Sequence, residues 1–247
     1  MNGLANGVIA SIIAGIFGTT TGAFIAVLIN KIIRNKNSYV IENITKSLLG
    51  FSGGLMIVIV CFDLIPSAYE LSSFYTTFIG VLAGTIIIPI LDIAFYYKRK
   101  SYRNKYHKVG LTIFLSIAMH NLPEGLALGA GFGASQEFGI ALAIVIAMHN
   151  IPEGLAMATP MLADRQKAMS ILAYAFICGV PTVLGSFAGG YFAEISSQFI
   201  GICLGFAAGA MMYVVVGEMF PLSYNKSFKI NVIYIIVGFI VGLMLTK

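Results

Sequence analysis

Eight long apolar stretches constrain what this chain can fold into. Each is close to the length of about 20 residues that an α-helix needs to cross a bilayer. In lipid the backbone has to satisfy its own hydrogen bonds, and a helix does so within itself. Only 10% of the 247 residues are charged, whereas about a quarter are charged in a soluble domain. We therefore expect an all-α integral membrane fold with eight transmembrane helices in a single transmembrane domain, residues 1–247. The approximate helices are 4–30, 47–65, 74–97, 109–129, 138–160, 169–193, 199–220 and 230–246.

Lysine and arginine occur only in alternate connections between these stretches and at the last residue, Lys247. Because basic loops stay on the cytoplasmic side, we expect a multi-pass protein of the plasma (inner) membrane with both termini outside. This topology also explains the net charge of +5, so we expect no nucleic-acid partner. His107, within the basic connection 98–108, is expected to be solvated. The basic residues are Lys31, Arg34, Lys36 and Lys46, then Lys98, Arg99, Lys100, Arg103, Lys105 and Lys108, then Arg165 and Lys167, and finally Lys226 and Lys229.

A short polar motif occurs twice inside the apolar stretches. Residues 118–128 read AMHNLPEGLAL and residues 147–157 read AMHNIPEGLAM. On a helix, positions i and i+4 share a face, so His120 lies beside Glu124 and His149 beside Glu153. Two imidazoles and two carboxylates are a first shell for a divalent metal, and we predict that these four residues bind one.

The asparagine after each histidine adds an oxygen donor to the predicted site. Asn121 and Asn150 are rotated by about 100° from the histidines on an α-helix. Their amide oxygens are suited to a neighbouring second metal position.

The depth of these groups requires a positive charge from outside the chain. His120 and His149 are each about eleven residues into their stretch, near the bilayer centre at a rise of about 1.5 Å per residue. An ionised acid at that depth costs about 2.5–3.5 kcal/mol on insertion scales. No lysine or arginine lies inside any of the eight stretches. Metal ions, protons or both must therefore compensate the carboxylates.

A proline follows each histidine by three residues and leaves one backbone carbonyl next to the predicted site without its helical hydrogen bond. Pro123 has no amide hydrogen for the carbonyl of Met119, and Pro152 has none for Met148. Irregular backbone at membrane depth is tolerated where it lines a cavity or is buried in protein. We therefore add Met119 and Met148 to the predicted transport pathway.

A second internal repeat relates residues 49–69 to residues 204–224. Both copies carry LGFxxGxM, then an acid, Asp63 or Glu218, and a proline three residues later. A weaker repeat matches Thr19 to Thr182. These pairs predict an inverted repeat, in which helices 1–3 are related to helices 6–8 and helix 4 to helix 5, a plan of many secondary transporters. Asp63, Glu218 and Thr182 are predicted to lie along the pathway.

The doubled HNxPEG motif, together with the acids of the second and seventh stretches, resembles the ZIP (Zrt/Irt-like) family of divalent-metal transporters. The resemblance covers essentially the whole chain and is nearest to the bacterial GufA- and ZupT-like branch. It implies one metal position at His120, Glu124, His149 and Glu153. It also implies a second position at Asn121 and Asn150, with the glutamates bridging. Some members complete that position with a glutamate in the sixth stretch, where residues 179–185 offer only Thr182.

The function expected from these features is transport of Zn²⁺ into the cytoplasm, with Fe²⁺, Mn²⁺, Co²⁺ and Cd²⁺ as further candidates. The metal is cargo, and no prosthetic group or enzymatic activity is expected. The partners are divalent metal ions and the lipid bilayer, and a homodimer is compatible with the sequence. The isolated Cys61, Cys178 and Cys203 read as small packing residues, and the lack of thiolate ligands argues against Cu⁺.

Two alternatives are compatible with parts of the pattern. An intramembrane metalloprotease would use His-x-x-x-Glu as half of a zinc site, but the usual His-Glu-x-x-His is missing from the sequence. A proton-coupled carrier of another solute would use the acids as a relay, but it would not need two matched histidines.

Overall fold

The computed structural model describes residues 2–33, 38–98, 105–191, 196–224 and 228–245. Within these ranges the chain is helical, apart from short turns between helices. Three of the spans contain a π turn, in which the helix is locally wider. In chain order the elements are α1 (Asn2–Ser11), η1 (Ile12–Phe17), α2 (Gly18–Ile33), α3 (Ser38–Ile59), η2 (Val60–Leu64), α4 (Ile65–Leu71), α5 (Phe74–Lys98), α6 (Lys105–Ala134), α7 (Gln136–Ala163), α8 (Ala168–Tyr191), α9 (Ser197–Tyr213), η3 (Val214–Met219), α10 (Phe220–Ser223) and α11 (Phe228–Leu245).

These helices have the length and composition of membrane spans. Seven helical stretches of the described chain are long and apolar enough to cross a bilayer. An eighth, Val232–Leu245, is apolar and shorter. The prediction of an all-α, multi-pass membrane fold is therefore confirmed.

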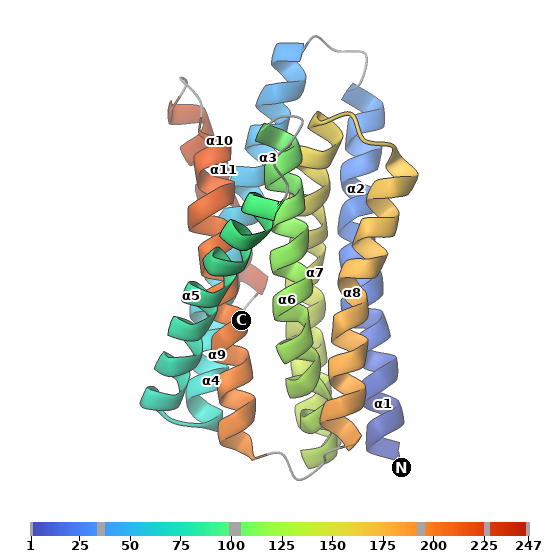
Figure 1. The fold of residues 1–247 in the computed structure, drawn as a ribbon, viewed down its shortest axis with the longest axis vertical. Coiled ribbons are helices and arrows are strands. Elements are labelled where there is room, and N and C mark those ends of the chain that lie inside the picture. Colours follow the sequence, from blue (N-terminus) through green and yellow to red (C-terminus); the bar gives the residue numbers. More distant parts are fainter. Residues whose placement is uncertain (1, 34–37, 99–104, 192–195, 225–227, 246–247) are drawn as a thin grey trace.

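Helices α6 and α7 form the centre of the bundle (Figure 1). Helices α1, α2 and α8 lie on one side of them, and α3, α5, α9 and α11 lie on the other. Along these sides α6 packs on α8, and α2 packs on α7. In the second group α5 packs on α9, and α11 packs on α3. The helices that carry both polar motifs are thus enclosed by protein.

Two glycines allow the central helices to approach their neighbours closely. A Cβ at Gly125 of α6 would collide with the main-chain oxygen of Thr182 in α8. A Cβ at Gly154 of α7 would collide with the main-chain oxygen of Thr19 in α2. Each glycine follows the glutamate of its motif, so the close approach is made beside the predicted metal ligands.

Contacts of this kind occur in matching pairs, as an inverted repeat requires. Packing of α6 on α8 corresponds to packing of α7 on α2, and α9 on α5 corresponds to α3 on α11. The π turns η2 and η3 contain Asp63 and Glu218, and each is followed by its proline. These pairs agree with the proposed repeat, which stays a prediction.

The described structure corrects three expectations from the sequence. His107 is half-buried rather than simply solvated: it lies on the first turns of α6, with Nδ1 2.8 Å from a carboxylate oxygen of the buried Asp164. Lys46 does not lie in a connection, because α3 begins at Ser38. It is buried and pairs with Glu42 at 2.8 Å. Cys61 is exposed rather than packed, whereas Cys178 and Cys203 are buried.

The predicted membrane orientation depends partly on residues outside the described ranges. It therefore stays a prediction. These residues are Arg34, Lys36, Arg99, Lys100, Arg103, Lys226 and Lys247.

Candidate metal site

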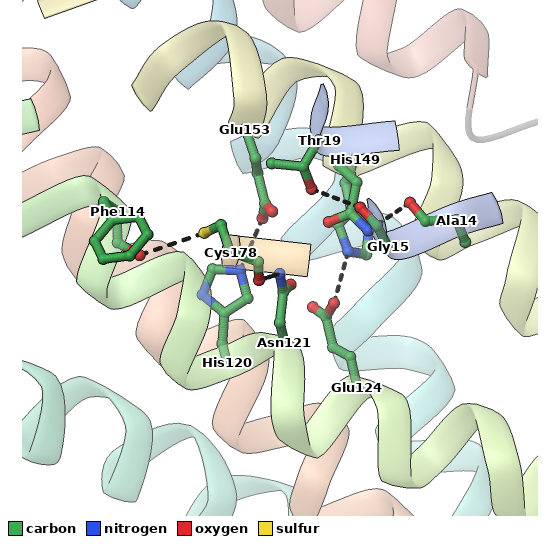
Figure 2. Close-up of polar contacts among 11 residues, drawn as sticks. Ala14, Gly15, Thr19, Phe114, His120, Asn121, Glu124, His149, Glu153 and Cys178 are labelled. Atoms are coloured by element: carbon green, nitrogen blue, oxygen red, sulfur yellow. Dashed lines mark hydrogen bonds and ion pairs between the residues drawn. The ribbon is translucent and has the colours of Figure 1, made fainter. Parts of the chain in front are cut away.

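The two motifs meet between α6 and α7, and their side chains pair across the helices (Figure 2). His120 of α6 places Nε2 2.9 Å from a carboxylate oxygen of Glu153 in α7. His149 of α7 places Nε2 3.1 Å from a carboxylate oxygen of Glu124 in α6. Each histidine thus contacts the glutamate of the other motif. The i, i+4 spacing correctly placed each pair on one helix face, and the two faces are turned toward one another.

The site is fully enclosed by protein. His120, Glu124, His149 and Glu153 have no exposed surface, and neither do Asn121 and Asn150. When both carboxylates are ionised they can only accept, so each Nε2 carries the hydrogen of its contact. Such contacts to an ionised carboxylate are strong in a medium of low dielectric constant.

Several polar atoms of the site have no hydrogen-bond partner among the described residues. They are Nδ1 of both histidines, one carboxylate oxygen each of Glu124 and Glu153, and Oδ1 of both asparagines. Buried polar groups in proteins are nearly always paired. Imidazole nitrogens and carboxylate or amide oxygens are the donors that bind zinc and similar divalent ions, so this donor set fits such an ion as substrate.

The four titratable side chains of the two motifs do not converge on a single point. In the described part of the chain, no group of three or more His, Cys, Asp and Glu side chains has the arrangement of a metal cage. The reason is the cross-pairing, because each Nε2 is directed at a carboxylate oxygen. A cation that binds here has to replace both of these hydrogen bonds.

The two asparagines are anchored by their amide nitrogens. Asn121 donates from Nδ2 to the carbonyl of Cys178 in α8, at 2.8 Å. Asn150 donates from Nδ2 to the carbonyl of Ala14 in η1, at 2.9 Å. The helices on one side of the central pair therefore hold both asparagines in place.

The predicted pathway residues differ in burial, and their place on a pathway stays a prediction. Thr182 is fully buried on α8, and its hydroxyl has no partner in the described structure. Asp63 and Glu218 are half-buried in η2 and η3, and η3 contacts α6. Met119 and Met148 are half-buried beside the histidines.

Sequence reasoning missed the groups that hold the asparagines. The carbonyls of Ala14 and Cys178 have no side-chain signature, and the π turn at residues 12–17 was not predicted. Cys178 was assigned to packing only. Its thiol also donates to the carbonyl of Phe114 in α6, at 3.4 Å.

Comparison with known proteins decides the family. The profile described as ZIP Zinc transporter matches residues 97–246, which is more than half of the chain and includes both motifs. The chain belongs to the ZIP zinc transporter family. Zinc transporter ZupT of Corynebacterium glutamicum is 29% identical over 92% of this chain and 94% of its own. Zinc transporter GufA of Myxococcus xanthus is 37% identical over 48% of this chain and 47% of its own. Human zinc transporter ZIP11 is 37% identical over 48% of this chain and 36% of its own.

Membership confirms the predicted class of function. This ZIP protein is a multi-pass membrane transporter of divalent metal ions and not an enzyme. The metalloprotease and the carrier of another solute find no support. Bacterial relatives of this chain carry the names ZupT and GufA, as the resemblance in the motifs implied.

Proposed function

We propose that this ZIP protein carries Zn²⁺ across the plasma membrane into the cytoplasm through a site formed by His120, Glu124, His149 and Glu153. The observation that carries the proposal is the pair of fully buried His–Glu contacts between α6 and α7. Relatives over most of the chain length are named zinc transporters. Zinc is therefore the first cargo to test.

Charge balance supports a divalent cation. The contacts of Glu124 and Glu153 that the structure describes are to histidines, which must be neutral to bind metal. One divalent ion then neutralises the two carboxylates, so that the occupied site carries no net charge in a region where charge is costly. Donors of intermediate hardness suit Zn²⁺, and also Fe²⁺, Mn²⁺, Co²⁺ and Cd²⁺.

The proposed route through the membrane uses the acidic and neutral oxygen-bearing residues predicted from the sequence. Asp63 and Glu218 attract the cation on its way to and from the histidines, and Asn121, Asn150 and Thr182 offer neutral oxygens beside them. The carbonyls of Met119 and Met148, which receive no amide hydrogen from the prolines four residues later, are further candidate oxygens on this route. Uptake toward the cytoplasm corresponds to basic connections inside and both termini outside.

Metal binding by the purified protein tests this site. Equilibrium dialysis with radioactive Zn²⁺ should show binding by the wild type and a loss of at least about tenfold in affinity for Glu124→Gln with Glu153→Gln, because a bound ligand pair is removed. The matched control is Glu137→Gln, at an exposed position in the first turn of α7. The proposal is wrong if the double variant binds zinc as the wild type does.

A further inference from the structure

Each asparagine of the site is tied to the main chain of a neighbouring helix. Asn150 reaches the carbonyl of Ala14, and Asn121 reaches the carbonyl of Cys178. Both side chains are fully buried. The two contacts are equivalent in chemistry, and each joins a motif helix to a helix of the group α1, η1, α2 and α8.

The π turn makes the Ala14 carbonyl available. In a regular α-helix the amide of Gly18 would donate to the carbonyl of Ala14. In η1 that amide instead contacts the carbonyls of Gly15 and Ile13. The Ala14 carbonyl therefore does not receive the Gly18 amide and accepts from Asn150. π turns inside helices are frequent at functional sites.

The α8 contact does not involve a π turn. Pro181 inside α8 has no amide hydrogen for the carbonyl of Ile177, four residues earlier, and so it does not free the carbonyl of Cys178. Ala14 and Cys178 are each followed by a glycine and then, a few residues later, by a threonine, Thr19 or Thr182. The threonine comes five residues after Ala14 in the first case and four residues after Cys178 in the second. The additional residue lies within the π turn.

An amide that donates to a carbonyl has its oxygen fixed as well. Because Nδ2 faces the carbonyl, Oδ1 must point elsewhere, and flipping the amide would set two oxygens against each other. In the described structure Oδ1 of Asn121 and of Asn150 has no partner. Both oxygens are therefore held in one orientation and are available to a ligand.

We propose that the carbonyls of Ala14 and Cys178 are positioning groups, which fix the oxygens of Asn150 and Asn121 toward the transported cation and thereby set the metal preference. The inference rests on the proposed function of the His–Glu site. It assigns a role to η1 and α8 that does not require any of their side chains to touch the metal.

One glycine allows this geometry to be disturbed without removing a ligand. A Cβ added at Gly18 would lie 3.0 Å from Cβ of Asn150, and its next neighbour would be the carbonyl of Ala147 at 3.7 Å. Gly18→Ala therefore presses on Asn150 alone. The matched control is Gly7→Ala in α1, where the new Cβ would lie 3.1 Å from the hydroxyl of Ser186.

Cobalt absorption of the purified full chain gives the readout, because the d–d spectrum of Co²⁺ reports ligand geometry. Competition with Zn²⁺ and Cd²⁺ gives the metal preference. We expect Asn150→Ala and Gly18→Ala to change the spectrum and to shift the Zn²⁺ to Cd²⁺ preference by about tenfold, as is usual when an orienting partner is altered. Gly7→Ala should match the wild type.

The outcomes separate this inference from the proposed site itself. If Gly18→Ala resembles Gly7→Ala while Asn150→Ala differs from the wild type, the asparagine binds metal without the positioning contact, and the inference is wrong. The inference is also wrong if Asn150→Ala and Asn121→Ala leave the Co²⁺ absorption spectrum unchanged. These two variants give a result even if Gly18→Ala fails to fold. A cobalt spectrum that survives His120→Ala with His149→Ala would instead overturn the proposed site.

Discussion

At the residue scale, the contacts described for the histidines and glutamates join α6 to α7, rather than residues four apart within one helix. His120 pairs with Glu153, and His149 pairs with Glu124, at 2.9 and 3.1 Å. Removing one partner of a buried charged pair leaves the other uncompensated, which costs about 3–5 kcal/mol. The same side chains therefore serve the stability of the metal-free protein and the binding of its cargo.

A double-mutant cycle tests the cross-pairing. We expect His120→Ala and Glu153→Ala to be strongly coupled, with an interaction free energy of about 1–3 kcal/mol, as for residues in direct contact. His120→Ala and Glu124→Ala, on one helix, should be closer to additive. The measurement is denaturant unfolding of metal-free protein in detergent. Stronger coupling within α6 than between α6 and α7 would contradict the pairing.

Zinc uptake should depend on pH in a direction set by the histidines. Imidazole binds metal only when neutral, and it ordinarily titrates near pH 6.5, to within about a unit. Lowering the pH adds protons that compete with Zn²⁺ for both histidines, so uptake should weaken on the acidic side and recover above neutrality. Initial rates across a pH series check this, and undiminished uptake at about pH 5 would rule out histidine ligands.

The ligand residues could be predicted from the sequence, but their partners could not. The period of a helix places His120 and Glu124 on one face, whatever that face meets. Which carboxylate each imidazole contacts depends on how α6 and α7 are rotated against each other. That rotation is fixed by packing with the surrounding helices.

At the element scale, close glycine contacts set the distance of α6 and α7 from their neighbours. Gly125 lies against the main chain of Thr182, and Gly154 lies against the main chain of Thr19. A backbone oxygen cannot move aside as the end of a flexible side chain can. These positions therefore tolerate no side chain without a shift of a whole helix.

Alanine substitution tests these contacts. Gly154→Ala should lower the free energy of unfolding by about 1–3 kcal/mol, as overpacking does, and should lower the melting temperature. Gly217→Ala is the control, because Gly217 is exposed and the nearest atom to its new Cβ is a ring carbon of Tyr213 at 3.3 Å. The measurement is thermal unfolding of both variants in detergent. Equal melting temperatures for Gly154→Ala and Gly217→Ala would show that the contact between α7 and α2 is not tight.

The eight apolar spans could be predicted from hydropathy, whereas the π turns could not. A π turn depends on which backbone pairs form, as with the amide of Gly18 in η1, and composition does not report this choice. Some helices begin earlier than hydropathy predicts, because polar residues continue them beyond the apolar stretch. Helix α6 is an example: it includes His107, whose contact with Asp164 could not be predicted because the two residues are far apart in the sequence.

At the scale of the whole molecule, the arrangement encloses a polar centre in an apolar bundle. Large apolar side chains are exposed on the outside of the bundle, and the histidines and glutamates of the two motifs in α6 and α7 are fully buried. The order of the spans was readable from the sequence, but which helices are neighbours was suggested only by the internal repeats. In the proposed function, the buried centre takes its compensating charge from the cation that the protein transports.

Zinc influx into proteoliposomes tests the central claim most directly. Purified wild-type protein should give saturable Zn²⁺ influx, and the double variant His120→Ala, His149→Ala should give none while remaining folded by size-exclusion chromatography. Saturation is expected because the cation binds a defined site before it crosses. Equal influx in both proteins, or no influx of Zn²⁺, Fe²⁺, Mn²⁺ or Cd²⁺ in either, would contradict transport through the site between α6 and α7.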